Sequence, residues 1–217
     1  MAYLEGIKSS LADLKEELVL QLVREALAAR VPARDILTAC QDGLTEVGRR
    51  FESQEYVVSD LMMSGEIFRE IGISLEPELT VSGSAAAGKI VFGTVKGDIH
   101  DIGKDIVVDM LKSANFDVID LGVDVPAEIF VDTVKQTGAK VLGMSGLLTL
   151  AFDSMKATVR ALQTAGIRHD VKVMIGGGPV DASVCRYVGA DDWGGNPQQA
   201  VRLAKAWLAP RSMSRSR

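Results

Sequence analysis

From residue 89 to residue 208, short runs rich in valine and isoleucine alternate with segments of helical periodicity. The alternation occurs about five times, which predicts a parallel sheet covered by helices on both faces. With only about five strands, a flavodoxin-like strand order is favoured over the longer order of dinucleotide-binding folds. The strands are expected at 89–95, 117–121, 141–145, 172–175 and 191–193, and the helices at 104–114, 127–137, 152–165, 181–188 and 197–208.

Residues 1–80 follow a different pattern, with helical periodicity and no convincing strand. One apolar stripe at i, i+3 and i+4 spacings is formed by Leu11, Leu14, Leu18, Leu22 and Ala26. Pro32 interrupts that stripe and begins a second helix, which is expected at 33–51. Ser59 and Asp60 are expected to cap a further helix. The first part of the chain therefore predicts an all-α bundle of about four helices.

The change of pattern defines the expected domains. Small and polar residues at 81–88 lack periodicity and are typical of a linker. We therefore expect a helical domain at 1–80 and an α/β domain at 89–210. The basic residues at 211–217 are few and terminal, so they predict a disordered tail rather than an RNA-binding arm.

Charge and cysteine content exclude several classes of protein. The formal net charge is −5 at pH 7, whereas a general nucleic-acid binder needs a basic face. No apolar run approaches the ~20 residues of a membrane span, and no signal peptide is recognisable. Cys40 and Cys185 stand without a CxxC pair, so neither a disulfide framework nor a cysteine zinc site is expected. We expect a cytoplasmic protein that binds neither nucleic acid nor membranes.

One of the two histidines stands between an expected strand and an expected helix, in the run Gly97-Asp98-Ile99-His100-Asp101-Ile102-Gly103. Such a position lies at the carboxyl end of a sheet, where open α/β folds bind ligands. Asp98 can accept the second ring N–H of His100, which fixes the tautomer and makes the imidazole a better metal ligand. The alternative is a loop histidine bonded to the backbone. His169 lies in a turn before the fourth strand and is expected to be solvated and inert.

Two further loops at the same edge of the sheet are unusual. After the third strand stand Ser145, Leu147 and Thr149, and after the fourth strand stand Gly176, Gly177 and Gly178. Ser145 either caps the next helix or forms a hydrogen bond with Asp98. The glycines either form a tight turn or provide a wall without Cβ atoms, which suits a bulky ligand. Neither a GxGxxG dinucleotide signature nor a Walker lysine pattern occurs.

In this order and on these elements, the motifs resemble the cobalamin-binding domain over residues 89–208. They are Asp98-x-His100-x-x-Gly103, Ser145-x-Leu147, Gly176-Gly177 and the similar Gly189-Ala190-Asp191. The first part of the chain resembles the helical cap of methionine synthase and of corrinoid methyltransferase proteins. Its matching runs are Glu46-Val47-Gly48-Arg49-Arg50-Phe51, Glu55-Tyr56-Val57-Val58 and Leu61-Met62-Met63-Ser64-Gly65-Glu66. Val57 and Ser59 depart from the cap pattern, which usually has an aromatic residue and a proline there.

The resemblance implies that cobalamin binds with its own base displaced from cobalt and its nucleotide tail inserted into the α/β domain. His100 would be the lower axial ligand of the metal, Asp98 its hydrogen-bond acceptor and Ser145 the outer member of that chain. Gly103 would allow close approach beneath the corrin. The other residues implied at the cofactor are Ile99, Asp101 and Ile102 beside His100; Leu147, Thr149, Gly176, Gly177 and Gly178 along the tail channel; Val123 and Asp124 at the corrin rim; and Phe51, Tyr56, Val57, Leu61 and Met62 in the cap.

The function that the resemblance implies is that of a methyl carrier that catalyses little alone. It would accept a methyl group on cobalt from a substrate:corrinoid methyltransferase. It would deliver that group to a corrinoid:acceptor methyltransferase that uses tetrahydrofolate or coenzyme M, with a reductive activase for inactive Co(II). Methoxylated aromatics, methylamines and methanol are all open as methyl donors.

Three other functions are open at this point. A cobalamin-dependent sensor or regulator usually carries an added DNA-binding module, for which a first helix near residue 3 leaves no room. The cobalamin subunit of a mutase needs the α/β domain but not the helical cap. A flavodoxin-like protein that binds something else would bind its ligand without His100.

Overall fold

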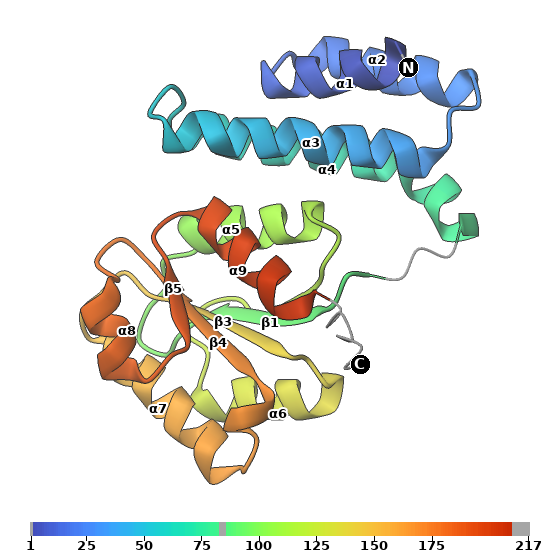
Figure 1. The fold of residues 1–217 in the computed structure, drawn as a ribbon. Helices are drawn as coiled ribbons and strands as arrows, with labels where there is room; N and C mark the ends of the chain where they lie inside the picture. Colours follow the sequence, from blue (N-terminus) through green and yellow to red (C-terminus); the bar gives the residue numbers. More distant parts are fainter. Residues whose placement is uncertain (1, 83–85, 210–217) are drawn as a thin grey trace, which may run out of the picture. The chain divides into compact units, whose positions relative to one another are not determined.

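The computed structural model describes residues 2–82 and 86–209. The chain divides into two compact units, residues 1–85 and 86–217, which we call the helical unit and the α/β unit (Figure 1). Helix α4 (Val58–Ser82) continues two residues into the linker predicted at 81–88. Residues 83–85 and the predicted tail at 211–217 lie outside the described residues.

The helical unit is the all-α bundle that the sequence predicts. Within residues 2–82 its helices are α1 (Ala2–Ala12), α2 (Glu16–Ala28), α3 (Ala33–Glu52) and α4 (Val58–Ser82). All four helices contribute to one core, which includes Ile7, Leu11, Val19, Val23, Ile36, Cys40, Leu44, Ile67, Ile71 and Leu75. This shared core makes the unit a packed body rather than a set of separate helices.

The stripe predicted through Leu11, Leu14, Leu18, Leu22 and Ala26 does not form one helix face. The chain turns between α1 and α2, and Leu14 there has a left-handed backbone (φ 56°). After the turn, Val19 and Val23 face the core, whereas Leu18 is exposed. Leu11 and Ala26 do lie in the core and Leu22 packs against it, so hydrophobic spacing misplaced only Leu14 and Leu18.

Helix α4 also begins earlier than predicted. Its first residue is Val58, so Ser59 and Asp60 stand inside the first turn rather than at the cap. The Asp60 carboxylate accepts the N–H of Val57 (2.7 Å). This is the reciprocal half of a capping box, in which a first-turn acidic residue reaches back to the residue before the helix.

The α/β unit contains an all-parallel sheet of five strands in the order β2-β1-β3-β4-β5. The predicted flavodoxin-like order is therefore confirmed. Helices α5 and α9 cover one face of the sheet, and α6, α7 and α8 cover the other (Figure 1). The elements are β1 Lys89–Thr94, α5 Ile102–Ser113, β2 Asp117–Asp120, α6 Ala127–Thr137, β3 Val141–Ser145, α7 Ala151–Thr164, the 3₁₀ turn η1 Arg168–Asp170, β4 Lys172–Gly176, α8 Ala182–Val188, β5 Asp192–Gly194 and α9 Pro197–Leu208.

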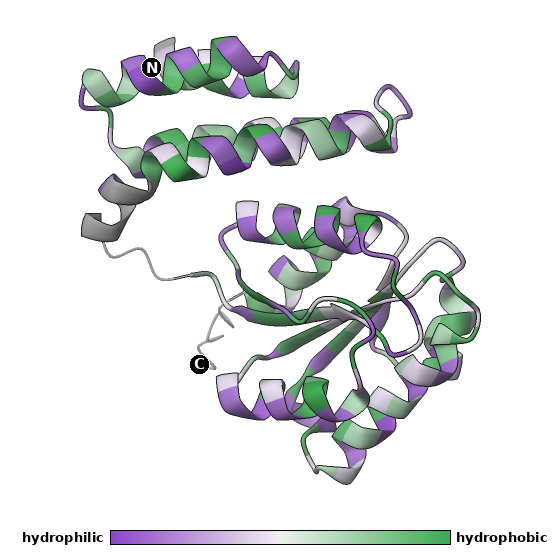
Figure 2. Ribbon diagram, turned by 180° about the vertical axis from the view of Figure 1, so that it is seen from behind, coloured by the Kyte–Doolittle hydropathy of each residue, from purple (hydrophilic) through white to green (hydrophobic). Residues whose placement is uncertain are grey.

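The central strands are buried on both faces of the sheet. Every residue of β1 after Lys89 is buried, and so are the first four residues of β3. The helices that cover them carry both hydrophilic and hydrophobic residues around their circumference (Figure 2). Because β1 lies between β2 and β3, the strand order reverses at β1 and β3. The crevice at the carboxyl ends of these two strands is the place where open α/β sheets bind ligands.

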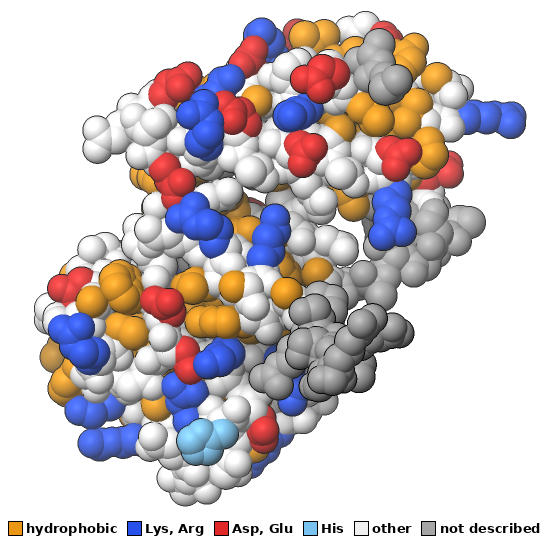
Figure 3. All heavy atoms as spheres, viewed as in Figure 1, with side chains coloured by type: hydrophobic (Ala, Val, Ile, Leu, Met, Phe, Trp, Pro, Cys, Tyr) orange, Lys and Arg blue, Asp and Glu red, His pale blue; other side chains and the backbone are white. Residues whose placement is uncertain are grey.

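Within the described residues, no helix is both long and apolar enough to cross a membrane. On the face of the molecule shown in Figure 3, cationic and acidic side chains are interspersed over both units.

Gly143 of β3 lies beside Phe92 of β1, and a Cβ atom at Gly143 would stand 2.1 Å from Phe92 Cε2. We expect Gly143→Ala to lower the free energy of unfolding of the α/β unit by about 1–3 kcal/mol, because the ring must move within a packed core. Urea unfolding followed by the fluorescence of Trp193 and Trp207, both in this unit, measures the loss.

Gly103→Ala is the matched control, because a Cβ atom there meets nothing within 4 Å. Its free energy of unfolding should stay within about 0.5 kcal/mol of the wild-type value. An unchanged value for Gly143→Ala would contradict the packing argument.

Candidate cofactor site at the carboxyl edge of the sheet

Three loops meet at the carboxyl ends of β1, β3 and β4. We call them the His100 loop (residues 95–101), the Leu147 loop (146–150) and the glycine loop (177–180). Strand register places Thr94 beside Ser145 and Ser145 beside Gly176, so the three strands end at the same level. The Val95 N–H also donates to the Ser145 carbonyl (3.1 Å). The three loops that the sequence singles out therefore share one edge of the sheet.

Asp98 is fully buried, and its carboxylate binds both the His100 loop and the Leu147 loop. Oδ1 accepts the His100 backbone N–H (3.0 Å) and lies 2.7 Å from His100 Nδ1. Oδ2 accepts the N–H groups of Leu147 (2.6 Å) and Leu148 (2.9 Å). Burial raises the pKa of Asp98, but the hydrogen bonds from Leu148, His100 and Leu147 outweigh it and lower the pKa to about 2. Asp98 is thus an anion at neutral pH.

The contact with Asp98 orients the ring of His100. When Nδ1 carries the proton and donates to Asp98, Nε2 is the nitrogen with a free lone pair. The side chain is 49% exposed, and the His100 carbonyl accepts the Thr94 hydroxyl (3.0 Å). Among the described residues, no group of three or more His, Cys, Asp or Glu could hold a metal ion. The exposed ring of His100 can offer one nitrogen to a metal whose other ligands come from elsewhere.

Ser145 plays neither of the two local roles considered for it. In the part of the chain that the structure describes, its hydroxyl forms no hydrogen bond with Asp98, because the amides of Leu147 and Leu148 bind Oδ2. It does not cap α7 either, since that helix begins at Ala151. The expected hydroxyl at the end of the His100–Asp98 chain is replaced by two backbone N–H groups.

Two glycines of the site differ in whether the fold requires them. Gly177 has a left-handed backbone (φ 136°), and a Cβ atom there would stand 1.9 Å from the Gly146 carbonyl oxygen. Only glycine allows this approach of the glycine loop to the Leu147 loop. Gly103 differs, because it lies in the first turn of α5 with an ordinary backbone and free space beside it. The fold does not require glycine at 103, so the free space there is available to a ligand.

Large hydrophobic side chains are exposed around this edge of the sheet. They are Ile99, Ile102, Val123, Leu147, Leu148 and Leu150. Asp101 and Thr149 are exposed in the same loops. A cluster of exposed apolar side chains is typical of a binding surface. Together with a half-exposed imidazole, this surface suits a flat, largely apolar ligand that carries a metal.

Sequence reasoning missed several residues that shape the site. Lys104 is buried in the first turn of α5 and pairs with Asp105 and with Asp120 at the end of β2 (2.5 Å each). The Asp124 carboxylate, which the sequence analysis named only for a corrin rim, accepts the Gly97 N–H (2.7 Å). An aspartate at the carboxyl end of the expected second strand was the available signal for Asp120, whereas its partner could not be read from one sequence.

The residues expected in the cap lie at the end of α3, in the turn that follows it and in the first turns of α4. The Tyr56 hydroxyl donates to the Ala12 carbonyl (2.8 Å) and accepts from Arg50 Nη1 (2.8 Å). Leu61 is buried in its own unit and Phe51 is partly buried, whereas Val57 and Met62 are exposed. The polar end of Tyr56 and the side chain of Leu61 are therefore used inside the helical unit.

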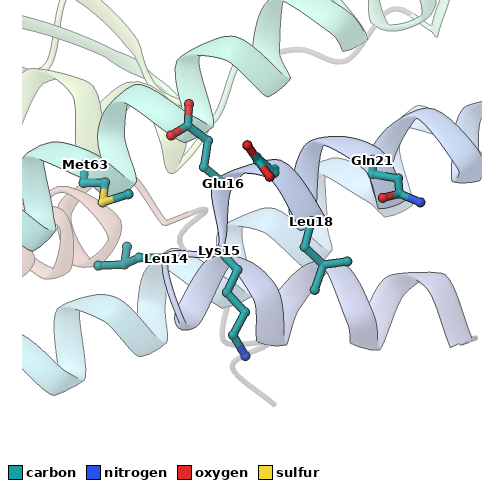
Figure 4. A pocket seen from close by; sticks show the side chains of 7 residues that line it. Leu14, Lys15, Glu16, Leu18, Gln21 and Met63 are labelled. Atoms are coloured by element: carbon teal, nitrogen blue, oxygen red, sulfur yellow. The ribbon is translucent and has the colours of Figure 1, made fainter.

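The helical unit also has a hollow of about 430 Å³ between α2, the turn before it and α4 (Figure 4). Its lining residues are Leu14, Lys15, Glu16, Glu17, Leu18, Gln21 and Met63. None of the cofactor residues expected from the sequence is among them. Met62 and Met63 are both exposed.

Comparisons with known proteins identify the family of both units. Residues 88–202 match the family described as the B12 binding domain, and residues 3–71 match a second family with the same description. Dimethylamine corrinoid protein 3 of Methanosarcina acetivorans is 37% identical over 212 residues, which cover 96% of this chain and 100% of that protein.

Solved structures agree with these matches. The crystal structure of a novel cobalamin-binding protein from Desulfitobacterium hafniense DCB-2 has a TM-score of 0.82 and 42% identity, covering 94% of this chain and 98% of that chain. The methanol:cobalamin methyltransferase complex MtaBC from Methanosarcina barkeri has a TM-score of 0.81 and 26% identity, covering 96% of this chain and 80% of that chain.

The stability of the site should depend on Asp98. Asp98→Ala leaves the part-buried N–H groups of Leu147, Leu148 and His100 without their acceptor. We expect it to lower the free energy of unfolding of the α/β unit by about 3–5 kcal/mol. Asp98→Asn keeps one acceptor oxygen and should lower it less. Urea unfolding followed by tryptophan fluorescence distinguishes the two variants, and equal losses would argue against the hydrogen-bond account.

The same carboxylate should contribute to acid sensitivity. Its folded pKa of about 2 lies below the ordinary value of 3.8, so its stabilising ionisation is fully present above about pH 4 and is lost as the pH falls towards 2. Asp98→Asn should therefore show a smaller loss of stability over this range than the wild type. The wild-type acid dependence in Asp98→Asn would contradict the assignment.

Proposed function

The chain belongs to the family of B12-binding proteins, and from that premise we propose that it is a corrinoid methyl carrier whose cobalt is ligated by His100. In this role it shuttles a methyl group between two methyltransferases. The proposal covers both units, because each of them matches a B12 binding domain.

One observation carries the assignment of His100. Its Nδ1 lies 2.7 Å from a buried carboxylate while the ring is half exposed, which leaves Nε2 available to a metal. A single imidazole is enough for the cobalt of a corrinoid, because the macrocycle supplies the equatorial ligands. Most metal-binding histidines donate their other ring N–H to a carboxylate, a backbone carbonyl or water, and Asp98 provides such a carboxylate.

The surroundings of His100 fit a corrinoid as well. The free space beside Gly103 allows the macrocycle to approach the first turn of α5. Ile99, Ile102 and Leu147 offer exposed apolar surface to its flat face. Ligand pockets combine such apolar surface with a few placed polar groups.

Bound cobalamin supplies a cobalt that can accept and release a methyl group. The chain's own residues bind and orient it. Asp98 holds His100 in one tautomer and stays charged at neutral pH. We propose that the exposed apolar side chains around His100 exclude water from the lower face, and that the helical unit shields the methyl group. Val57 and Met62 are the exposed candidates for that shield.

The names of the relatives guide the choice of partners. Relatives are described as dimethylamine corrinoid protein and as part of a methanol:cobalamin methyltransferase complex. We propose a substrate methyltransferase as the first partner and methylamines as the first donors to test. An acceptor methyltransferase that uses tetrahydrofolate or coenzyme M and a reductive activase complete the proposed set. A cytoplasmic location stays a prediction.

The helical unit also bears on one alternative. The cobalamin subunit of a mutase would need the α/β unit alone, whereas residues 3–71 match a B12 binding domain of their own. This match favours the carrier over the mutase subunit.

His100→Ala tests the axial ligand. After anaerobic loading with methylcobalamin, we expect the wild type to bind it stoichiometrically with a histidine-ligated visible spectrum, and the variant to lack that spectrum. His169→Ala is the matched control, because His169 is exposed in η1 and should behave as the wild type. A folded wild type that retains no corrinoid would overturn the proposal.

Gly103→Ala tests the approach of the macrocycle. The added methyl group meets no protein atom, so the fold should be unaffected, but it occupies the space proposed for the corrin. We expect about a tenfold loss of affinity for methylcobalamin, the effect of roughly 1–2 kcal/mol of steric conflict. Titration followed by visible absorbance measures it, and wild-type affinity would place the macrocycle elsewhere.

A further inference from the structure

The segment that begins at the last residue of β2, residues 120–125, contacts the chain on both sides of His100. We call it the β2-end segment. Before the histidine it binds Gly97 and Asp98, and after the histidine it binds Lys104 in the first turn of α5. The proposed carrier function gives these contacts no role, although they enclose the residue that ligates the metal.

Asp124 holds the upstream side of the His100 loop. Its Oδ1 accepts the Gly97 N–H (2.7 Å), and its own N–H donates to the Asp98 carbonyl (3.0 Å). Asp124 has a left-handed backbone (φ 54°), which is uncommon for residues other than glycine although aspartate tolerates it better than most. One residue in an unusual conformation therefore binds the turn that delivers Asp98 to the imidazole.

Asp120 binds the chain on the C-terminal side of His100, in the first turn of α5. Its Oδ2 pairs with the buried Nζ of Lys104 (2.5 Å), and its Oδ1 accepts the Gly122 N–H (2.9 Å). Burial alone would lower the pKa of Lys104, but the bonds to Asp105 and Asp120 outweigh it and raise the pKa, so the side chain is an ammonium. A buried ion pair of this kind contributes little net stability compared with apolar residues of the same size. We therefore explain the ion pair by the position that it gives to the first turn of α5 relative to the end of β2.

The β2-end segment is itself anchored to β1. The Thr94 N–H donates to the Gly122 carbonyl (2.9 Å), and the Val125 N–H donates to the Thr94 carbonyl (3.0 Å). Val95 and Val125 also form a parallel bridge. The segment therefore has a fixed place relative to the sheet, and the His100 loop is held against a fixed support.

We propose that Asp120 and Asp124 are positioning residues for His100, which hold the loop on both sides so that the imidazole meets the corrinoid in one orientation. The inference rests on the proposed function, because it concerns the ligand that His100 provides. Asp98 acts differently, since it binds the ring itself. A ring that is 49% exposed has few contacts of its own, so its place depends on the loop that carries it.

Two variants remove the two contacts separately. Asp124→Gly removes the carboxylate acceptor and also relieves the left-handed backbone, so the fold should tolerate it. Lys104→Met breaks the contact with Asp120 without leaving a buried charge unpaired, and methionine suits a helix. Asn115→Gly and Asp117→Asn are the controls. The first relieves a left-handed backbone (φ 69°) at the other end of α5, and the second removes a carboxylate at the amino end of β2.

The first readout is axial ligation. Each variant is loaded anaerobically with methylcobalamin, and the visible spectrum gives the fraction ligated by histidine. We expect each single variant to lower the equilibrium constant for ligation about threefold to tenfold, the effect of one lost hydrogen bond or ion pair, and the double variant to lower it further. The controls should match the wild type. Asp124→Asn keeps an acceptor oxygen and should restore wild-type ligation.

The second readout needs no cofactor. Hydrogen exchange of the unloaded protein should be faster at residues 97–104 in Asp124→Gly and Lys104→Met than in the wild type. Exchange in the rest of the α/β unit should be unchanged, which distinguishes a released loop from a destabilised fold.

The outcomes separate the inference from the proposed function. A wild type without histidine ligation overturns both. A histidine-ligated wild type, with folded variants that match it in ligation and exchange, overturns the inference alone. A loss of ligation in Asn115→Gly as large as in Asp124→Gly also overturns the inference, because relief of backbone strain would then be the cause.

Discussion

The site depends on the buried carboxylate of Asp98. One oxygen binds the imidazole and backbone of His100, and the other binds two amides of the Leu147 loop. These partners follow neighbouring strands, β1 and β3, which lead to helices on opposite faces of the sheet. A charge without water can persist there only while both loops supply their donors. The orientation of His100 therefore depends on the contact between the His100 loop and the Leu147 loop that Asp98 maintains, at the point where the strand order reverses.

The α/β unit could be predicted from the sequence because its signals are local. Apolar runs of strand length alternate with helical segments, and the helices at 127–137 and 197–208 were placed at their observed bounds. The His100–Asp98 contact was also predictable, since the two residues stand only two positions apart. The remaining partners of Asp98 were not, because every residue has a backbone N–H and none is marked in the sequence. The contacts of Asp124 with Gly97 and of Lys104 with Asp120 span 27 and 16 residues and required the fold.

The helical unit shows the limit of periodicity more clearly. Leu14 fits an apolar stripe but lies in a turn with left-handed backbone, which spacing cannot reveal. The neighbours Leu61 and Met62 are both apolar, yet one is buried and the other is half exposed. Tyr56 is of a residue type that often contacts ligands, but its hydroxyl donates to the Ala12 carbonyl at the end of α1. In each case the outcome depends on packing between helices, which single-sequence patterns do not record.

Among the described residues, His100 is not part of a cluster of metal-ligating side chains, and this has a consequence for which metals the site can select. Protein sites for zinc and similar ions gather three or four side-chain ligands, and the described residues offer no such group. A free divalent cation would find a single imidazole in the His100 loop, fewer ligands than such sites usually have. In the proposed function, the loops around His100 present their exposed apolar side chains to a macrocycle that brings its own metal. Under that proposal the protein would recognise the shape of the macrocycle, and the identity of the metal would be decided where the macrocycle is made.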